Sequence, residues 1–165
     1  MIRPVRAILV LVCAVGGAVA VSAPAAAQSR AGGTFGVGLV LGDPTGVTAE
    51  YNRRTRGFGN AIEAAVGIDT FDDDHLYAHL VWKFYLTEIV RGRDIDVPLY
   101  AGVGPWLAEA GGDDDLHVGA RAPFGIALDF RHAPVQVYFE LAFVLRVVDD
   151  VDAGIGAALG FRYYF

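Results

Sequence analysis

Cysteine is nearly absent from this sequence, and the single one, Cys13, lies close to the amino terminus. Beyond residue 27 the chain has no cysteine and one serine, Ser29. A disulfide framework is therefore excluded from that part of the chain, and a serine or cysteine nucleophile has almost no candidate. The HExxH, CxxC and phosphate-binding glycine-loop patterns are also missing. We therefore expect neither an enzyme nor a cofactor.

Long apolar runs are missing from the body of the chain, so no helix of the kind that crosses a bilayer is expected there. The one long apolar stretch is residues 7–21, which follows Arg3 and Arg6 and precedes Ala25-Ala26-Ala27. This order of positive charge, apolar core and small residues is typical of a cleaved secretory signal peptide. We predict a signal peptide over residues 1–27, a flexible lead over 28–33 and one domain over 34–165.

Positive charge is scarce as well. The formal net charge is -6, and loss of Arg3 and Arg6 with the signal peptide changes it to -8. Such a chain is a poor partner for nucleic acid, whose phosphates attract Lys and Arg. An exported protein without cysteine suits the bacterial envelope.

Alternating apolar and polar residues fill the rest of the sequence, and no helical periodicity occurs. A period of two predicts strands, and turn-forming residues such as Gly42-Asp43-Pro44 separate the segments. We predict eight strands: Thr34–Leu41, Val47–Arg53, Asn60–Ile68, His75–Leu86, Val97–Ala108, Leu116–Phe130, Val135–Arg146 and Ala153–Phe165.

Three irregularities interrupt this pattern. Pro105 and Pro123 fall inside predicted strands, where a missing N–H predicts a bulge or an early end to the ladder. Residues Thr87 to Asp96 are mostly polar and are predicted to form a ten-residue connection.

Each segment separates its large apolar residues from its charges. Glu50, Glu63, Lys83, Arg121, Glu140 and Arg162 all lie on the face opposite the large apolar side chains. A soluble lipocalin-like barrel would have the reverse arrangement, with apolar residues around a ligand. A charge on a lipid-facing surface costs roughly 2–4 kcal/mol near the bilayer midplane, and the sequence avoids that cost. We therefore predict an all-β, eight-stranded antiparallel up-and-down transmembrane β-barrel with its polar face inside.

The last strand ends on alternating aromatic residues, Phe161, Tyr163 and Phe165. It resembles the closing strand of bacterial outer-membrane barrels, whose terminal aromatic residue is read by the barrel assembly machinery. The run from Gly36 to Gly46, GVGLVLGDPTG, and the ending RYYF are similar to a family of small eight-stranded outer-membrane barrels of unknown function, with the OmpA and OmpX type of architecture. The resemblance implies this fold and an outer-membrane location, and it carries no activity.

Charges inside a narrow barrel need partners. We predict a salt-bridge network inside the barrel, centred on Arg121 and Lys83 and including Glu50, Glu63 and Glu140. Because Glu50 and Glu63 lie on neighbouring strands, they are expected to repel, and one of them is a candidate for protonation.

Acidic residues gather in the connections that would face outward if both termini are periplasmic. These connections hold no Lys or Arg. Carboxylates and lipid phosphates are both ligands for hard divalent cations, so a rim that binds Ca²⁺ or Mg²⁺ is one interpretation. The other is that these are solvated turn residues. The candidate metal-binding residues are Asp72, Asp73, Asp74, Asp113, Asp114, Asp115, Asp149 and Asp150.

Together these features predict an integral outer-membrane protein with a structural or surface-recognition role, a closed polar interior and an acidic outer rim. Its expected partners are outer-membrane lipids, lipopolysaccharide and the barrel assembly machinery. Two alternatives remain open at this point. One is a lipid-modifying enzyme of the outer membrane, and the other is a periplasmic lipocalin-like binder of a small ligand.

Overall fold

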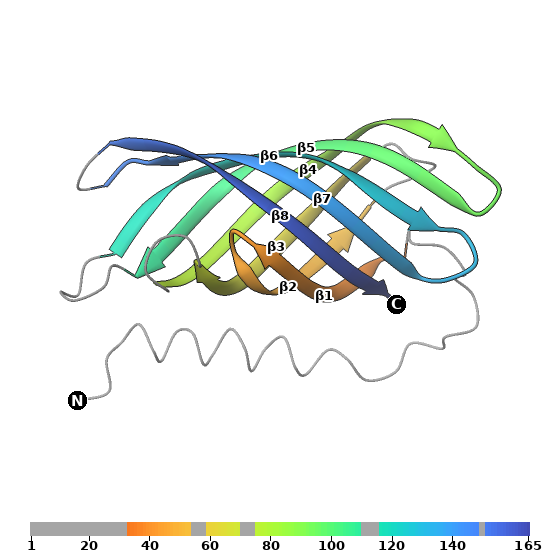
Figure 1. Cartoon of the computed structure of the whole chain (residues 1–165), viewed down its shortest axis with the longest axis horizontal. Coiled ribbons are helices and arrows are strands. Elements are labelled where there is room, and N and C mark those ends of the chain that lie inside the picture. The colour runs from red at the N-terminus through yellow and green to blue at the C-terminus, as the bar shows by residue number, and fades with distance from the viewer. Residues whose placement is uncertain (1–32, 54–58, 70–74, 110–115, 149–150) are drawn as a thin grey trace.

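A computed structural model describes residues 33–53, 59–69, 75–109, 116–148 and 151–165. These residues form eight strands, and each predicted strand has a counterpart (Figure 1). Their bounds are β1 Phe35–Gly42, β2 Thr45–Asn52, β3 Gly59–Asp69, β4 His75–Arg91, β5 Ile95–Glu109, β6 Leu116–Phe130, β7 Val135–Arg146 and β8 Asp152–Tyr164. The predicted signal peptide lies outside the described residues, as does nearly all of the predicted lead.

Every strand pairs antiparallel with the next one in sequence, and β8 pairs antiparallel with β1. The sheet is therefore a closed barrel in the order β1 to β8, as the ribbon shows (Figure 1). The predicted fold class, an eight-stranded antiparallel up-and-down barrel, is confirmed. The described residues contain no helix long and apolar enough to cross a membrane.

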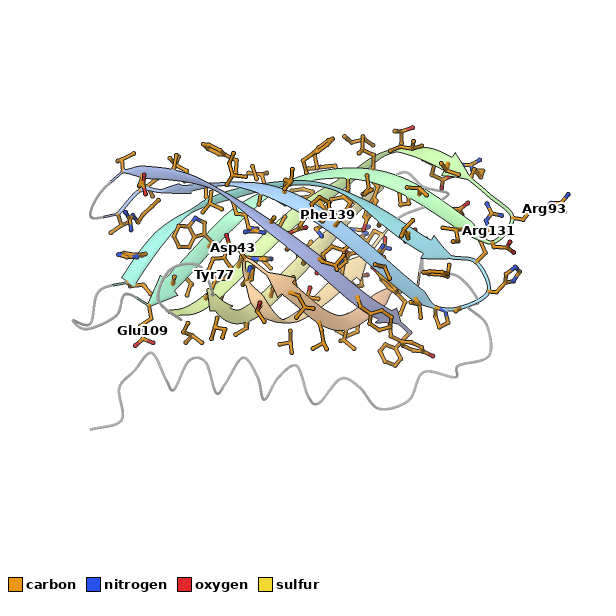
Figure 2. All side chains as sticks on the ribbon, in the orientation of Figure 1. Asp43, Tyr77, Arg93, Glu109, Arg131 and Phe139 are labelled. Atoms are coloured by element: carbon orange, nitrogen blue, oxygen red, sulfur yellow. The ribbon has the colours of Figure 1, made fainter. Side chains whose placement is uncertain are left out.

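The alternating residues of each strand face the inside and the outside of the barrel in turn. Large apolar side chains point away from the barrel on all eight strands, and many are about half exposed, for example Leu39 at 59%, Val103 at 55% and Phe143 at 52%. Side chains at the intervening positions are buried, and the charged ones among them are almost fully so. Side chains project from both sides of the ribbon (Figure 2). The interior of the barrel thus holds buried charged and aromatic side chains, and its outer surface is apolar.

Two ends can be told apart. The loop end holds Asp43, Glu109 and the β7–β8 connection, and the terminal end holds the turns at Arg93 and Arg131 together with the end of β8. Glu109 and the two arginines lie at opposite ends of the barrel (Figure 2).

The predicted ten-residue connection from Thr87 to Asp96 is wrong. Strand β4 continues to Arg91, and β5 begins at Ile95. Two register shifts in β4, between Tyr85 and Thr87 and between Glu88 and Val90, carry the ladder through this stretch. Each bulge inserts a residue and changes which side chains face outward, so the simple alternation that marks a strand is lost while the pairing continues.

The prolines do not interrupt their strands, so the bulge or early end predicted at Pro105 and Pro123 is wrong. Pro105 pairs with Ala120 and Pro123 pairs with Ala142, and the register on these ladders is the same on either side. A proline removes one N–H donor, but in this barrel the neighbouring residues keep both strands in register.

The β1–β2 hairpin is short and tightly closed. Gly42 has φ of 114°, a backbone conformation that favours glycine, and the Asp43–Pro44 peptide is cis. The Gly42 amide donates to Thr45 Oγ1 over 3.1 Å, and the Thr45 hydroxyl donates to the Gly42 carbonyl over 3.0 Å. The Asp43 amide donates to the Ala157 carbonyl of β8 over 2.9 Å. The tip of the hairpin therefore bonds to itself and to β8.

Candidate functional site

The interior of the barrel is the only place where the predicted charged residues gather among the described parts of the chain. The five residues predicted for an internal network all lie there, each no more than 1% exposed, and they come from β2, β3, β4, β6 and β7. We call them, together with Arg162 of β8, the charged cluster: Glu50, Glu63, Lys83, Arg121, Glu140 and Arg162.

Lys83 lies among all three glutamates. Its Nζ is 3.4 Å from Glu140 Oε2 and 3.9 Å from Glu50 Oε2, and it donates to Glu63 Oε2. The same Nζ lies over the rings of Tyr100 and Tyr138, at 4.4 Å and 5.0 Å from their centroids. Both contacts are within cation–π range. One ammonium group thus lies within ion-pair distance of three carboxylates from three strands.

Arg162 joins Glu50 and Glu63, which face each other directly in the β2–β3 ladder. Its Nη1 donates to Glu50 Oε2 over 2.9 Å, and its Nη2 donates to Glu63 Oε2. Its guanidinium carbon is 3.9 Å from the centroid of the Tyr138 ring. The expected repulsion between the two carboxylates is met by two cations that contact both, Arg162 and Lys83.

Arg121 lies toward the loop end of the charged cluster. Its Nη2 donates to Glu140 Oε1 over 3.0 Å and to the backbone carbonyl of Asp43 over 3.1 Å. Its Nη1 donates to the Tyr77 hydroxyl over 3.5 Å. Asp43, in the β1–β2 turn, is partly buried, and its carboxylate lies against Gly156 of β8. Arg121 therefore ties the β1–β2 turn to the interior.

Sequence reasoning did not place Arg162 in the network, although the alternation of β8 puts it on the interior face. It also missed the tyrosine hydroxyls. Tyr85 and Tyr164 donate to Glu50 Oε1 over 3.1 Å and 2.7 Å, and Tyr100 donates to Glu140 Oε2 over 2.9 Å. A signal for these contacts exists, because each tyrosine shares the charged face of its strand.

Glycines make room for the interior rings. Four aromatic residues each lie directly across the ladder from a glycine: Tyr164 from Gly36, Tyr100 from Gly125, Trp106 from Gly119 and Tyr138 from Gly160. A Cβ at any of these glycines would come within 3.0 Å of the facing ring, and the approach would be closest at Gly160. These four glycines are therefore a packing requirement of the facing rings.

A second interior group lies nearer the loop end. Tyr77 and Trp106 stack, with centroids 5.7 Å apart and an angle of 11° between their planes, and they form a cluster with Ala108 and the partly buried Val144. The indole Nε1 of Trp106 donates to the Leu145 carbonyl over 3.2 Å. We call Tyr77, Trp106, Ala108 and Val144 the aromatic cluster. It contains no charged group.

At the terminal end, Arg131 is held by Asp96. Its Nη2 and Nε both donate to Asp96 Oδ1, over 2.6 Å and 3.0 Å. This hydrogen bonding raises the pKa of Arg131 above its usual value.

The other predicted residues lie elsewhere. Phe161, Tyr163 and Phe165 point outward near the terminal end, 40–48% exposed, and the rings of the last two are 5.1 Å apart. All eight aspartates proposed for the metal-binding rim lie outside the described residues. Within the described ranges there is no group of three or more His, Cys, Asp or Glu that is suited to a metal ion.

Comparison with known proteins yields one solved structure. The chain is similar to the crystal structure of the N-terminal β-barrel domain of Pseudomonas aeruginosa OprF, with 12% sequence identity and a TM-score of 0.47 over 82% of this chain and 98% of that chain. No protein-family model matches the chain, and no curated protein matches it. The assignment of a barrel therefore rests on the strand pairing itself.

Proposed function

We propose that this protein is an integral β-barrel of the bacterial outer membrane with a structural or surface-recognition role. The observation that carries the proposal is the apolar surface: large hydrophobic side chains are exposed on every strand, while the charged cluster is buried. In water such a surface would drive association. In a bilayer it is the expected outer surface of a closed barrel, whose backbone groups are all paired between strands.

The packed interior favours a structural role over a pore or a small-ligand carrier. Arg121, Arg162 and four tyrosines are fully or almost fully buried within the barrel. An eight-stranded barrel has room for its own side chains and little else. A lipocalin-like binder would need an apolar interior, whereas the large apolar residues of this barrel face outward.

Cell fractionation combined with gel mobility tests the proposal. We expect the protein in the outer-membrane fraction, and we expect the folded barrel to run faster than the boiled chain on a gel. Recovery from the periplasm as a folded protein that needs no detergent would contradict the membrane proposal and favour the lipocalin-like alternative. Release of fatty acid from outer-membrane lipids by the purified barrel would instead favour the enzyme.

We further propose that Phe161, Tyr163 and Phe165 form the assembly signal. Their rings project from the barrel at the end of β8, where an assembly factor outside the barrel can reach them. Deletion of Phe165 is expected to leave protein in the periplasm, whereas removal of the exposed ring in Phe143→Ala, a residue away from the terminus, is expected to leave targeting unchanged. Normal insertion of the truncated chain would contradict this assignment.

The acidic rim remains a proposal about Ca²⁺ or Mg²⁺ and lipid phosphate. We expect calcium to raise thermal stability in bilayers that contain lipopolysaccharide, and a chelator to reverse the rise. The variant Asp72/Asp73/Asp74→Asn should lose this response. An identical stability with calcium and with chelator, in both proteins, would show that these aspartates are ordinary solvated loop residues.

A further inference from the structure

The strands that form the barrel wall are shortest at the β1–β2 hairpin. Strands β1 and β2 have eight residues each, whereas the other six strands have 11 to 17. A transmembrane strand needs about 9–11 residues. With a rise of about 3.3 Å per residue and a tilt of about 40°, eight residues span roughly 20 Å along the barrel axis, short of the apolar band of about 25 Å.

The hairpin tip is built for apolar surroundings. Hydrogen bonds from Asp43 to β8, between Gly42 and Thr45, and from Arg121 to the Asp43 carbonyl satisfy the backbone N–H and C=O groups of Gly42 and Asp43. Leu41 and Val47 flank the tip on the outer surface, at 59% and 55% exposed. Internal pairing of this kind is what a chain segment surrounded by lipid requires.

Beyond the hairpin tip, toward the loop end, the edge of β8 that faces β1 has no strand partner among the described residues. Its ladder with β1 ends at Ala158, and the described residues from Asp152 to Gly156 pair with β7 only. Among the described residues the inner face of β8 is also uncovered there, because a Cβ added at Gly154 would meet none of their atoms within 4 Å. At Gly156 the Asp43 carboxylate already occupies that space, and at Gly160 the Tyr138 ring does.

The aromatic cluster lies next to this open position. Gly154 pairs with Val144 across the β7–β8 ladder, and Val144 packs against Tyr77, Trp106 and Ala108. The uncovered face of β8 is therefore continuous with an uncharged, ring-lined part of the interior. Below it, Asp43 and Arg121 mark the start of the charged region.

We propose that the gap above the β1–β2 hairpin is a lateral portal through which an alkyl chain of an outer-leaflet lipid enters the barrel and lies over Gly154 against Val144 and Trp106. The inference rests on the proposed membrane location. An alkyl chain fits better than a phosphate headgroup, because the open position borders Val144 and the nearby Asp43 carboxylate would repel an anion, whereas Asp152 is paired with Arg146. The charged cluster limits how far the alkyl chain extends into the barrel.

Quenching by lipids brominated on their acyl chains tests the portal, because bromine quenches tryptophan only at short range. The protein has two tryptophans, the outward-facing Trp82 and the interior Trp106. In Trp82→Phe, which leaves Trp106 as the single reporter, we expect clear quenching by brominated lipid. Adding Gly154→Leu, which fills the open position, should remove most of that quenching.

Two controls separate the possible failures. In Trp106→Phe, the exposed Trp82 should be quenched with or without Gly154→Leu, which reports on the membrane location alone. Gly154→Ala is a milder filler that fits the same space and should reduce the quenching of Trp106 in part. Heat-dependent gel mobility confirms that each variant is folded.

Trp106 that is unquenched while Trp82 is quenched would overturn the portal and leave the membrane location intact. If neither Gly154→Ala nor Gly154→Leu changes the quenching of Trp106, bromine acts on Trp106 through the barrel wall. This result would also overturn the portal. Unquenched Trp82 would overturn the membrane proposal itself.

Discussion

The charged cluster and the aromatic cluster share one interior, but they connect the strands in different ways. The charged cluster joins β2, β3, β4, β6, β7 and β8, and Arg162 reaches partners 112 and 99 residues away in sequence. The aromatic cluster joins β4, β5 and β7 by a stacked pair, one hydrogen bond to backbone and local packing, and its Tyr77 hydroxyl also accepts a long hydrogen bond from Arg121. The charged cluster connects strands on opposite sides of the interior, whereas the aromatic cluster covers one part of the inner wall.

The difference decides what a substitution costs. Each cation of the charged cluster serves several acceptors that are shielded from water, so its loss leaves carboxylates buried without compensation. The aromatic cluster has no such penalty, and it borders the open position at Gly154. The interior therefore combines a region of buried ion pairs with an uncharged region that borders the open position at Gly154.

The largest effect is expected at Arg162. Arg162→Met removes one of the two cations that contact both Glu50 and Glu63 and leaves Lys83 as the other. Loss of one partner from a buried ion pair costs about 3–5 kcal/mol, and we expect the free energy of unfolding in lipid vesicles to fall by that amount. Urea titration followed by tryptophan fluorescence measures it. A change smaller than that of Arg121→Ala would show that the charged cluster is not organised around Arg162.

A smaller loss is expected for Arg121→Ala. Glu140 keeps Lys83 at 3.4 Å and the Tyr100 hydroxyl at 2.9 Å, so the unfolding free energy should fall by about 2–3 kcal/mol. The double variant Arg121→Ala/Glu140→Gln should recover part of this loss. An unchanged unfolding midpoint for Arg121→Ala would refute the network.

Two glycines of β8 give a matched comparison of closed and open interior. Gly160→Ala places a Cβ against the Tyr138 ring, too close for an ordinary contact, and the overpacking should cost about 1–3 kcal/mol. Gly154→Ala places a Cβ where no atom of the described residues lies within 4 Å, and it should leave stability unchanged or raise it by up to about 1 kcal/mol. The same urea titration measures both variants. Equal losses at both positions would contradict the open space at Gly154.

The smallest effect is expected for an ion pair near the loop end. Arg146 Nη2 is 3.6 Å from Asp152 Oδ2, and the Asp152 side chain is largely exposed. Exposed pairs contribute about 0–1 kcal/mol, so Arg146→Met should change the unfolding midpoint little. A loss as large as that of Arg162→Met would mean that burial does not set the strength of these pairs.

The barrel was accessible from sequence because the two faces of each strand differ so clearly. The alternation around Glu140 on β7, for example, predicted strand bounds that the structure reproduces. It failed at β4, because bulges near Thr87 and Ile89 break the period of two without ending the pairing. Single-strand patterns do not contain the cross-strand register that reveals a bulge.

The sequence predicted which residues face the interior, but it did not predict which of their side chains contact one another. Alternation places Glu50, Lys83 and Arg162 on the same face, which is a local property. Which cation meets which carboxylate depends on strand tilt and on the closure of β8 against β1. The same closure, together with the short β1, creates the open position at Gly154, which no pattern along β8 alone distinguishes from Gly160.

The central claim is that the apolar outer surface faces lipid, and Leu141→Arg tests it most directly. Leu141 lies near the middle of β7 and is 48% exposed on the outer surface. In lipid vesicles we predict that this substitution lowers the free energy of unfolding by about 2–4 kcal/mol, the cost of an arginine near the bilayer midplane. An unfolding free energy equal to that of the native protein would contradict the account, because arginine at an exposed position is tolerated only where the surface faces water.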